Sequence, residues 1–338
     1  MSSINPTLQV WHLIQSHRVT AVIYVAAKLG IPELLRDGPL SANELAKSTG
    51  ADKQALNRLL VALSTIGICA AAGEDRYSLT ELGAVLDGTA EQSFKAWAIF
   101  EGQMLYSRWN GLLDSIVTGK TAAQLQGVSD SFELMARNPE AVSIFNAAMV
   151  DVTRFVTPDV LRAYDFGGIT HLMDVGGGSG ELIGAIAKQY PSIRGTVFDL
   201  PRCAESAISH LDHMGVSGRT KFLSGDFFQT VPTGADAIIM KSIIHDWNDE
   251  RSLKILANCR RALPENGKLL LVERILPELP SVSEEHREQA MSDLNMLRGP
   301  GGLERTEKQY NRLLDHAGFQ QLAVLPAGRF GVIEARVR

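Results

Sequence analysis

Residues 171–180 read His-Leu-Met-Asp-Val-Gly-Gly-Gly-Ser-Gly, and this stretch decides the fold. Its first half, His171–Val175, is a short apolar run typical of a buried strand. Its second half, Gly176–Gly180, is a glycine-rich turn, and a segment with helical periodicity follows it to about Tyr190. Glycines in such a turn allow positive φ angles and let the backbone pass close to a ligand. A strand, a glycine turn and a helix in this order are typical of an α/β domain.

The same alternation of strand and helix continues along the chain. Apolar runs predict six further strands, at 195–199, 220–223, 235–241, 268–272, 320–325 and 330–336. Helical segments end near Met214 and Leu263, and the capping box Thr306–Gln309 starts a helix before the last two strands. We therefore predict a Rossmann-like α/β domain with a mostly parallel seven-stranded sheet and helices on both faces.

The chain before about residue 168 has a different pattern, in which nearly every segment has the period of an amphipathic helix. Helices are predicted at 7–35 with a break at Gly30 and Pro32, and at 42–48, 52–66, 94–117 and 131–164. The capping box Ser41–Glu44 starts the second of them. Arg76–Leu79 has the pattern of one strand of a β-wing. Helix, turn, helix and wing together predict an N-terminal winged-helix domain of the all-α class.

The charge of the chain restricts its partners. The net charge is −5 and no run of Lys or Arg occurs, so nucleic acid is not an expected partner. Four basic and four acidic residues balance within the winged-helix segment: Lys47, Lys53, Arg58 and Arg76 against Glu44, Asp52, Glu74 and Asp75. A DNA-reading module carries a basic face, so this neutral one indicates a scaffold or a dimerisation surface.

No segment indicates secretion, a membrane span or a metal site. Met1–Pro6 lacks the basic-then-apolar order of a signal peptide. The apolar stretch Val19–Ile31 is interrupted by Lys28 and is too short to cross a bilayer. The three cysteines are widely spaced and form no cluster typical of metal ligands. We expect a cytoplasmic protein with no membrane partner and no metal.

Three acids at successive strand ends indicate a cofactor site. Asp174 lies two residues before the first glycine of a GxGxG loop, whereas the dinucleotide-binding turn has GxGxxG spacing. S-adenosylmethionine (SAM) carries an ammonium group for such an acid and no phosphate for a helix N-terminus, so the loop favours SAM. Asp199 could accept hydrogen bonds from ribose hydroxyls, and Asp226 one from the adenine amine while Phe227 packs on the ring. Singly, each acid is more often a loop-end cap.

Among the eight histidines, only His245 lies at a strand end beside the glycine loop. That carboxyl edge is where open α/β sheets place their sites. An imidazole held against a phenol, whose pKa is about 10, can take its proton at neutral pH. Its other nitrogen needs a carboxylate, and Glu273 and Glu304 are the candidates. The alternative, that His245 caps the next helix, is weaker because Asp246 or Asn248 would cap it better.

With these residues in place, the chain resembles the SAM-dependent, metal-independent small-molecule O-methyltransferases. That family includes plant caffeic acid and flavonoid enzymes, hydroxyindole O-methyltransferase and bacterial polyketide and phenazine enzymes. The motifs that carry the resemblance stand in the family's order: Asp-Val-Gly-Gly-Gly-Ser-Gly (174–180), Phe-Asp-Leu-Pro (198–201), Gly-Asp-Phe-Phe (225–228), Met-Lys-Ser-Ile-Ile-His-Asp-Trp (240–247) and Glu-Arg-Thr-Glu-Lys (304–308). The resemblance implies methyl transfer to a hydroxyl of a small, aromatic metabolite, with S-adenosylhomocysteine as the product.

The resemblance also implies roles for individual residues. The implied cofactor contacts are Asp174, Gly176, Gly178, Asp199, Leu200, Gly225, Asp226, Phe227 and Lys241. The implied catalytic residues are His245, as general base, and Glu273 and Glu304, which flank it. The implied substrate-pocket residues are Phe145, Met149, Trp247 and Met296. Residues 299–302 have glycine where plant lignin-pathway members carry a polar contact, so the acceptor stays open.

The family further implies a homodimer formed through the N-terminal half. We predict a winged-helix dimerisation domain at 1–90, a helical linker and substrate-pocket region at 91–165, and a SAM-binding catalytic domain at 166–338. Three alternatives remain beside this interpretation. A SAM-sensing winged-helix regulator lacks a basic recognition helix, and a nicotinamide dehydrogenase is disfavoured by the loop spacing and the terminal strand pair. A family member that binds SAM but performs hydroxylation or another reaction stays open.

Overall fold

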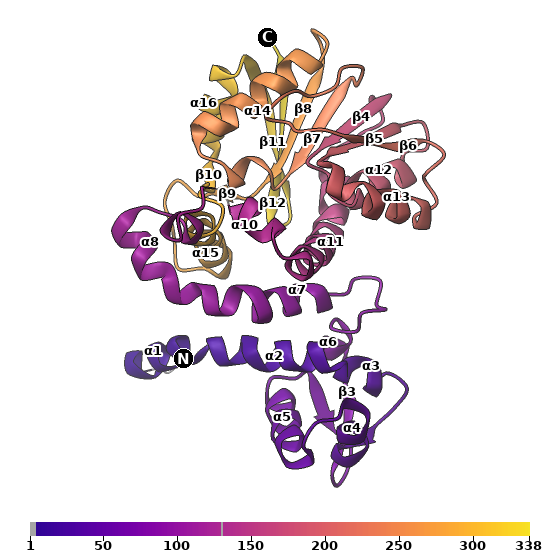
Figure 1. The fold of residues 1–338 in the computed structure, drawn as a ribbon, viewed down its shortest axis with the longest axis vertical. Coiled ribbons are helices and arrows are strands. Elements are labelled where there is room, and N and C mark those ends of the chain that lie inside the picture. The colour runs from indigo at the N-terminus through magenta and orange to yellow at the C-terminus, as the bar shows by residue number, and fades with distance from the viewer. Residues whose placement is uncertain (1–4, 130) are drawn as a thin grey trace. The chain divides into compact units, whose positions relative to one another are not determined.

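The computed structural model describes residues 5–129 and 131–338 (Figure 1). Residues 1–4, which belong to the Met1–Pro6 stretch considered above, lie outside the described residues. The chain divides into two compact units. The first contains Met1–Asn110 and Asn138–Val152, and the second contains Gly111–Arg137 and Thr153–Arg338. The functional division at residues 90 and 165 stays a prediction. Among the described helices, none has the length and apolar character that a bilayer span requires.

The first unit is helical and begins as the winged-helix pattern predicts. Its first helices are α1 (Pro6–Gln15), α2 (His17–Leu29), α3 (Ile31–Leu35), α4 (Ala42–Thr49), α5 (Lys53–Thr65) and α6 (Glu81–Ala84). Gly30, with φ of 68°, ends α2, so the predicted break is confirmed. The capping box at α4 is also confirmed, because Ser41 accepts from the Glu44 backbone N–H and Glu44 accepts from that of Ser41.

A small antiparallel sheet completes the winged-helix arrangement. Its strands are β1 (Leu40–Ser41), β2 (Cys69–Ala71) and β3 (Arg76–Leu79), in the order β1-β3-β2. The predicted wing strand at 76–79 is therefore confirmed. Leu45, Leu60 and Leu63 are fully buried in the core of this unit, because α4 and α5 pack their apolar faces together.

The two long helices predicted at 94–117 and 131–164 are each interrupted, so those predictions were wrong in detail. The first consists of α7 (Lys95–Phe100), a π-helical turn η1 (Glu101–Leu105), a 3₁₀ turn η2 (Tyr106–Gly111) and α8 (Leu112–Thr118). A Cβ at Gly102 would overlap the ring of Tyr24 on α2, so this close approach admits only glycine. The second divides into α10 (Ser131–Ala136) and α11 (Pro139–Ala163), where Asn138 accepts from the Ala141 backbone N–H.

The second unit contains the predicted seven-stranded sheet. Its strands are β4 (His171–Val175), β5 (Arg194–Asp199), β6 (Thr220–Ser224), β7 (Ala237–Lys241), β8 (Lys268–Glu273), β11 (Phe319–Ala327) and β12 (Phe330–Val337). They lie in the order β11-β12-β8-β7-β4-β5-β6. The five strands from β4 to β8 pair in parallel, and β12 pairs antiparallel with both β8 and β11. The mostly parallel sheet with a terminal strand pair is therefore confirmed.

Helices pack along this sheet (Figure 1). They are α12 (Glu181–Gln189), α13 (Ala204–His213), α14 (Asp249–Ala262) and α16 (Glu307–His316). Apolar side chains of α14 and α16, such as Ile255 and Leu314, share one buried core with the sheet residues Ile238 and Leu269. The unit also contains α9 (Ala122–Leu125), β9 (Ile275–Leu276), β10 (Arg305–Thr306) and α15 (Glu284–Arg298). Neither α15 nor the β9–β10 pair was predicted from the sequence.

The parallel strands end together at one edge of the sheet. In the register, Val175 lies opposite Phe198, Asp199 opposite Ser224, and Lys241 opposite Val272. The loops that follow β4 to β8 therefore begin at the same edge. This edge brings together the polar residues singled out in the sequence.

Candidate active site

The glycine loop connects β4 to α12 through three residues with positive φ. These angles are 75° at Gly176, 55° at Gly178 and 79° at Gly180. A Cβ at Gly176 would collide with the side chain of Ile243, whereas nothing lies within 4 Å of the Cβ position at Gly178. Gly176 thus permits close packing of two loops, and Gly178 borders open space beside the acids of the neighbouring strands.

The acids predicted at the strand ends bind the backbone of the loops themselves. Asp199 accepts from the backbone N–H of Gly178 at 2.8 Å and from that of Leu200 at 2.6 Å. Asp226 accepts from the backbone N–H of Phe228 at 2.8 Å. Each carboxylate oxygen has a second lone pair. These contacts therefore orient the acids and leave them able to accept from a ligand.

Two charged groups lie deeper at this edge. Asp174 is 2% exposed, and burial raises its pKa to about 7, with Lys241 opposing the shift. Burial and Arg274 lower the pKa of Lys241 to about 8. The Lys241 ammonium donates to Ser242 Oγ at 3.3 Å and lies 5.9 Å from the centre of the Phe330 ring. Gly225 and Phe227 follow β6 at the same edge and are half-buried.

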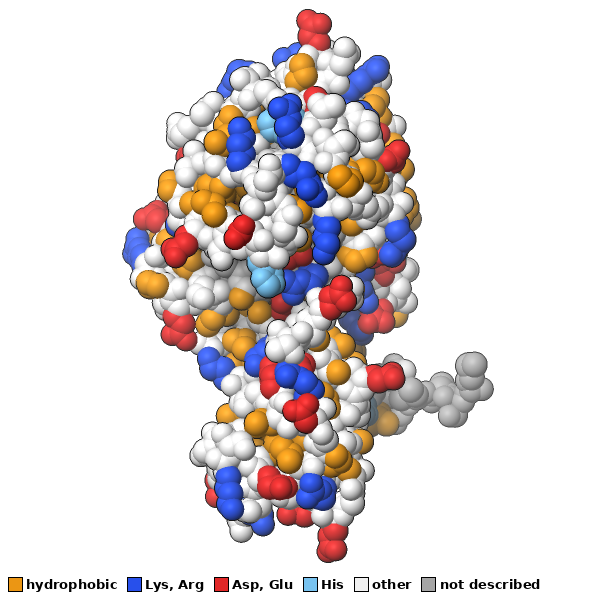
Figure 2. Space-filling model, turned by 90° about the vertical axis from the view of Figure 1, so that its right-hand side faces the viewer, with side chains coloured by type: hydrophobic (Ala, Val, Ile, Leu, Met, Phe, Trp, Pro, Cys, Tyr) orange, Lys and Arg blue, Asp and Glu red, His pale blue; other side chains and the backbone are white. Residues whose placement is uncertain are grey.

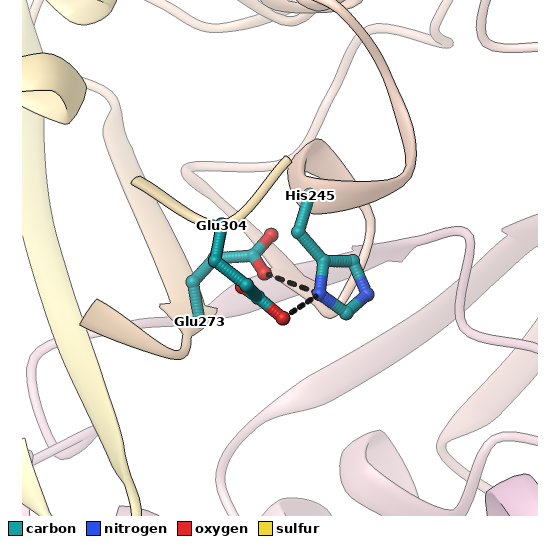
Figure 3. A group of neighbouring side chains, drawn as sticks. All are labelled: His245, Glu273 and Glu304. Carbon is teal, nitrogen blue, oxygen red and sulfur yellow. Dashed lines mark hydrogen bonds and ion pairs between the residues drawn. The ribbon is translucent and has the colours of Figure 1, made fainter. Parts of the chain in front are cut away.

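His245 lies in a short 3₁₀ turn, η4 (Ile244–Asp246), between β7 and α14. Its Nδ1 lies 2.9 Å from Glu304 Oε1 and 3.9 Å from Glu273 Oε2 (Figure 3). Figure 3 shows both carboxylates on the Nδ1 side of the ring, with Nε2 on the far side. The side chains of His245, Glu273 and Glu304 are buried. The structure therefore brings together the three residues predicted from the sequence.

The charges around the ring set its protonation. Burial alone would lower the pKa of His245, but Glu304, Glu273 and Asp246 outweigh it and raise this pKa to about 9. Burial likewise raises the pKa of Glu304, and the contacts with His245 and Ser292 outweigh it, so the pKa of Glu304 is lowered. Glu304 is consequently an ionised acceptor, and Nδ1–H is the donor in the bond between them.

Glu273 has a contact set that the sequence did not reveal. Its Oε1 accepts from the backbone N–H groups of Ile243 and Ile244, at 3.1 and 2.8 Å. Oε2, the oxygen nearer to His245, has no hydrogen-bond partner among the described residues. Glu273 therefore holds the backbone just before His245 as well as facing its ring. No local signal could have shown this, because the bonds join segments that are 29 and 30 residues apart.

Asp246 and Asn248 were both predicted as possible N-caps of α14, and only Asn248 has that role. Asn248 caps α14 by accepting from the Arg251 backbone N–H at 3.0 Å. Asp246 lies on the other side of the His245 ring, with Oδ1 3.6 Å from Nε2. Burial raises the pKa of Asp246 to about 7, and His245 opposes this shift. Asp246, which was predicted from the sequence only as a possible helix cap, is thus a residue of the candidate site.

Helix α15 supports Glu304 through two hydrogen bonds that were not predicted from the sequence. Ser292 Oγ donates to Glu304 Oε1 at 2.6 Å, and the Glu304 backbone N–H donates to Asp293 Oδ1 at 2.9 Å. The available signal was Ser283, which accepts from the His286 backbone N–H and so caps α15. An N-cap at Ser283 predicts a helix that carries Ser292 and Asp293 toward this edge.

The predicted pocket residues divide between the two units. In the first unit, Phe145 and Met149 lie on α11 and are half-buried, and Phe145 meets Phe100 edge-on at 5.7 Å between ring centres. In the second unit, Trp247 is 6% exposed and packs edge-on against Phe228, with ring centres 4.8 Å apart. Met296 on α15 is also buried. Each unit therefore contains two of the four predicted pocket residues.

Comparisons with known proteins identify the family of this chain. A family model described as an O-methyltransferase domain matches residues 109–320, and one described as an O-methyltransferase dimerisation domain matches residues 11–87. The phenazine O-methyltransferase PhzM of Lysobacter antibioticus is 38% identical over 325 residues, which are 96% of this chain and 94% of that protein. An 8-amino-8-demethylriboflavin N,N-dimethyltransferase of Streptomyces davaonensis is 32% identical over 94% of this chain and 92% of its own length.

A solved methyltransferase structure is also similar to this chain. Human N-acetylserotonin methyltransferase, in complex with SAM, superposes with a TM-score of 0.89 at 26% identity, covering 100% of this chain and 99% of that one. The family match covers well over half of the chain, and the sheet order and the two-part organisation agree with it. This chain therefore belongs to the O-methyltransferase family, with an N-terminal dimerisation domain and a C-terminal methyltransferase domain.

Proposed function

We propose that this protein transfers the methyl group of SAM to a hydroxyl oxygen of a small aromatic metabolite, with His245 as the general base. The observation that carries the proposal is the bond between His245 Nδ1 and Glu304 at the carboxyl edge of the sheet. A carboxylate on Nδ1 fixes the tautomer whose lone pair is on Nε2. Nε2 is then the atom that takes the proton from the acceptor hydroxyl.

The residues at the strand ends fit SAM. When bound, SAM supplies a methyl group on a positively charged sulfur, which is a good leaving group. We assign its contacts to Asp174, Gly176, Gly178, Asp199, Leu200, Gly225, Asp226, Phe227 and Lys241. Three observations support the fit: the open space beside Gly178, the half-buried Asp199 and Asp226, and the buried acid Asp174. Acidic acceptors suit ribose hydroxyls and amino groups, whereas phosphates would need N–H donors or cations.

The raised pKa of His245 has a consequence for the reaction. A base with a pKa of about 9 is matched to a phenol, whose pKa is about 10, so the proton transfer between them is nearly balanced. The same shift keeps most of the imidazole protonated at neutral pH. The rate should therefore rise as the pH rises above 7, because a greater fraction of His245 carries a free Nε2.

We propose that no metal takes part, although His245, Glu273 and Glu304 have the residue types and spacing of a metal-ligand group. The contacts of the two acids favour positioning of His245 instead. Glu273 Oε1 accepts two backbone N–H bonds, and Glu304 Oε1 bonds both Ser292 and His245. A divalent ion would have to displace Nδ1–H from Glu304 and would remove the base that the reaction needs.

We propose a homodimer formed through the N-terminal segment that matches the dimerisation model. Helix α1 presents a run of exposed apolar side chains: Leu8, Val10, Trp11, Leu13 and Ile14. A helix with no buried residue gains stability only when such a face is covered. A second copy of the chain is the proposed partner.

Nucleic acid is not a proposed partner. On the face that Figure 2 draws, acidic and basic side chains lie side by side over the first unit. Arg36 pairs with Asp87 at 2.5 Å and Lys95 with Glu33 at 2.6 Å, so these cations are already neutralised. We place the protein in a reducing compartment, the cytoplasm, because its three cysteines are free and two of them are buried.

The test is a panel of acceptors incubated with SAM labelled in the methyl group, followed by mass analysis of the product. We expect label on the oxygen of a phenolic acceptor and one equivalent of S-adenosylhomocysteine per methyl. Because one relative is an N,N-dimethyltransferase, the panel includes matched anilines. If the methyl group is transferred only to anilines, the acceptor is an amine nitrogen and the proposed hydroxyl acceptor is wrong. Cofactor consumption without a methylated product would favour the diverged reactions.

A further inference from the structure

Arg305 is a buried cation next to the proposed catalytic residues His245 and Glu304. It follows Glu304 directly, begins β10, and is 1% exposed. A buried guanidinium costs free energy unless its N–H groups are paired. Its carboxylate partner is Asp249, whose Oδ1 lies 3.0 Å from Nε and 2.7 Å from Nη2. The Asp249 side chain is 71% exposed, so water weakens this ion pair.

The rest of the guanidinium donates to the backbone on both sides of His245. Nη1 donates to the carbonyl of Ile244 at 3.1 Å, and Nη2 donates to that of Trp247 at 2.9 Å. The buried hydroxyl of Ser252 lies 3.4 and 3.2 Å from the same two carbonyl oxygens, between which it shares its one hydrogen, and it accepts from Arg305 Nη2 at 3.4 Å. A rigid planar fork can hold two carbonyls at a fixed separation, which a single ammonium group cannot do.

The residues before Arg305 contact His245 as well. The backbone N–H of Leu303 donates to the His245 carbonyl at 2.9 Å. A Cβ at Gly302 would overlap that carbonyl and the backbone of Asp246 and Trp247, so only glycine lets the segment approach this closely. Along extended chain, successive side chains point to opposite sides. Glu304 accordingly reaches the ring of His245, while Arg305 reaches the peptide groups that flank it.

We propose that Arg305 is a positioning residue, which holds the turn 244–247 by its two carbonyls and so keeps the ring of His245 against Glu304. The inference rests on the proposed role of His245 as the base. Without the fork, the contacts of Ser252 and Leu303 with the turn remain, and the ring is freer to move away from its carboxylate. A displacement of about 1 Å at a reacting group can reduce turnover by about 100-fold.

The test compares Arg305→Lys with the matched control Arg260→Lys. Arg260, in the last turn of α14, also donates to two backbone carbonyls, those of Gly318 and Arg338 at 3.2 and 3.1 Å. The control therefore makes the same chemical change at a backbone-binding arginine with no contact to the turn 244–247. Three quantities are measured: kcat for a phenolic acceptor, SAM affinity, and the titration of His245 by NMR on histidine-labelled protein.

For Arg305→Lys we expect kcat to fall by about 10- to 100-fold while SAM affinity changes less than about twofold. The His245 titration and the lower limb of the pH–rate profile should move down by about one pH unit, because the imidazole loses contact with Glu304. In Arg260→Lys, the pKa of His245 and the lower limb of the pH–rate profile should be the same as in the wild type. An Arg305→Lys protein whose kcat and titration match those of the control overturns the inference.

Ser252→Ala keeps the test decisive if Arg305→Lys does not fold. It removes the second donor to the same carbonyls, together with the oxygen that accepts from Arg305 Nη2 at 3.4 Å, and we expect kcat to fall by about 2- to 10-fold with a downward shift of the lower limb of the pH–rate profile. If the lower limb of the pH–rate profile of Ser252→Ala lies at the same pH as that of the wild type, the inference is overturned. The proposed function fails separately, if His245→Ala turns over as fast as the wild type. The NMR titration needs no turnover, so the two failures are distinguishable.

Discussion

Glu304→Gln changes the charge at the proposed base with almost no change of shape. Glu304 Oε1 lies 2.9 Å from His245 Nδ1, and the two residues are 1% and 7% exposed, so water screens the pair weakly. The glutamine amide oxygen can still accept from Nδ1–H. The ring should therefore keep its orientation while one negative charge beside it is lost.

The size of the effect follows from the acids around the ring. An opposite charge within about 4–6 Å moves a pKa by about 1–3 units. Of the three acids that raise the pKa of His245 to about 9, Glu304 contributes most, through its charge and its hydrogen bond. We expect the substitution to lower this pKa by about 1–2 units, or roughly 2 kcal/mol. A weaker base reacts more slowly, so the rate at high pH should fall by about 3- to 10-fold.

The assay is kcat/KM against pH, from about pH 6 to about pH 10, with labelled SAM and a phenolic acceptor. The wild-type rate should rise with pH through a midpoint near 9, because the base must lose its proton. The Glu304→Gln midpoint should be lower, so the variant should match or exceed the wild-type rate at neutral pH, where more of its His245 is unprotonated, and should be slower at high pH. Glu278→Gln is the control, since Glu278 is an exposed partner of Lys308. A uniform loss at every pH, with an unmoved midpoint, would refute the reasoning.

Three further predictions concern the cofactor, the metal and the dimer. Asp199→Ala should weaken SAM binding in calorimetry by about 2 kcal/mol or more, since a charged acceptor that also orients Gly178 and Leu200 is lost; unchanged affinity would sink the assignment. A chelator should not change the rate, and activity lost to the chelator and restored by magnesium would move the protein to a metal-dependent mechanism. Light scattering should give a dimer at micromolar concentration, and Trp11→Glu, at a side chain 61% exposed on α1, should shift it toward monomer; a monomeric wild type would contradict the proposal.

Local signals predicted most of the fold. The capping boxes at Ser41 and Thr306 are read within four residues, and both start helices in the structure. The strand before the glycine loop was predicted at 171–175, where β4 lies. These features depend on neighbouring residues alone, so one sequence is enough to find them.

Features that depend on distant partners were not predicted. The π-helical turn near Gly102 lies against the ring of Tyr24. The hydrophobic periodicity of residues 94–117 gives no sign of that contact, because Tyr24 lies far away in the sequence. The site shows the same division. His245 and its two acids could be named from strand ends and motifs. The backbone contacts of Glu273 and Arg305 join segments that only the folded chain brings together.

The central claim is that His245 takes the proton from the acceptor, and His245→Ala tests it most directly. Single-turnover methyl transfer and SAM affinity are measured on the same variant. We predict that SAM affinity stays nearly unchanged, because the assigned cofactor contacts lie on other residues, and that transfer slows by about 10²- to 10⁴-fold. Transfer to a phenol of ordinary pKa at the wild-type rate would contradict the account.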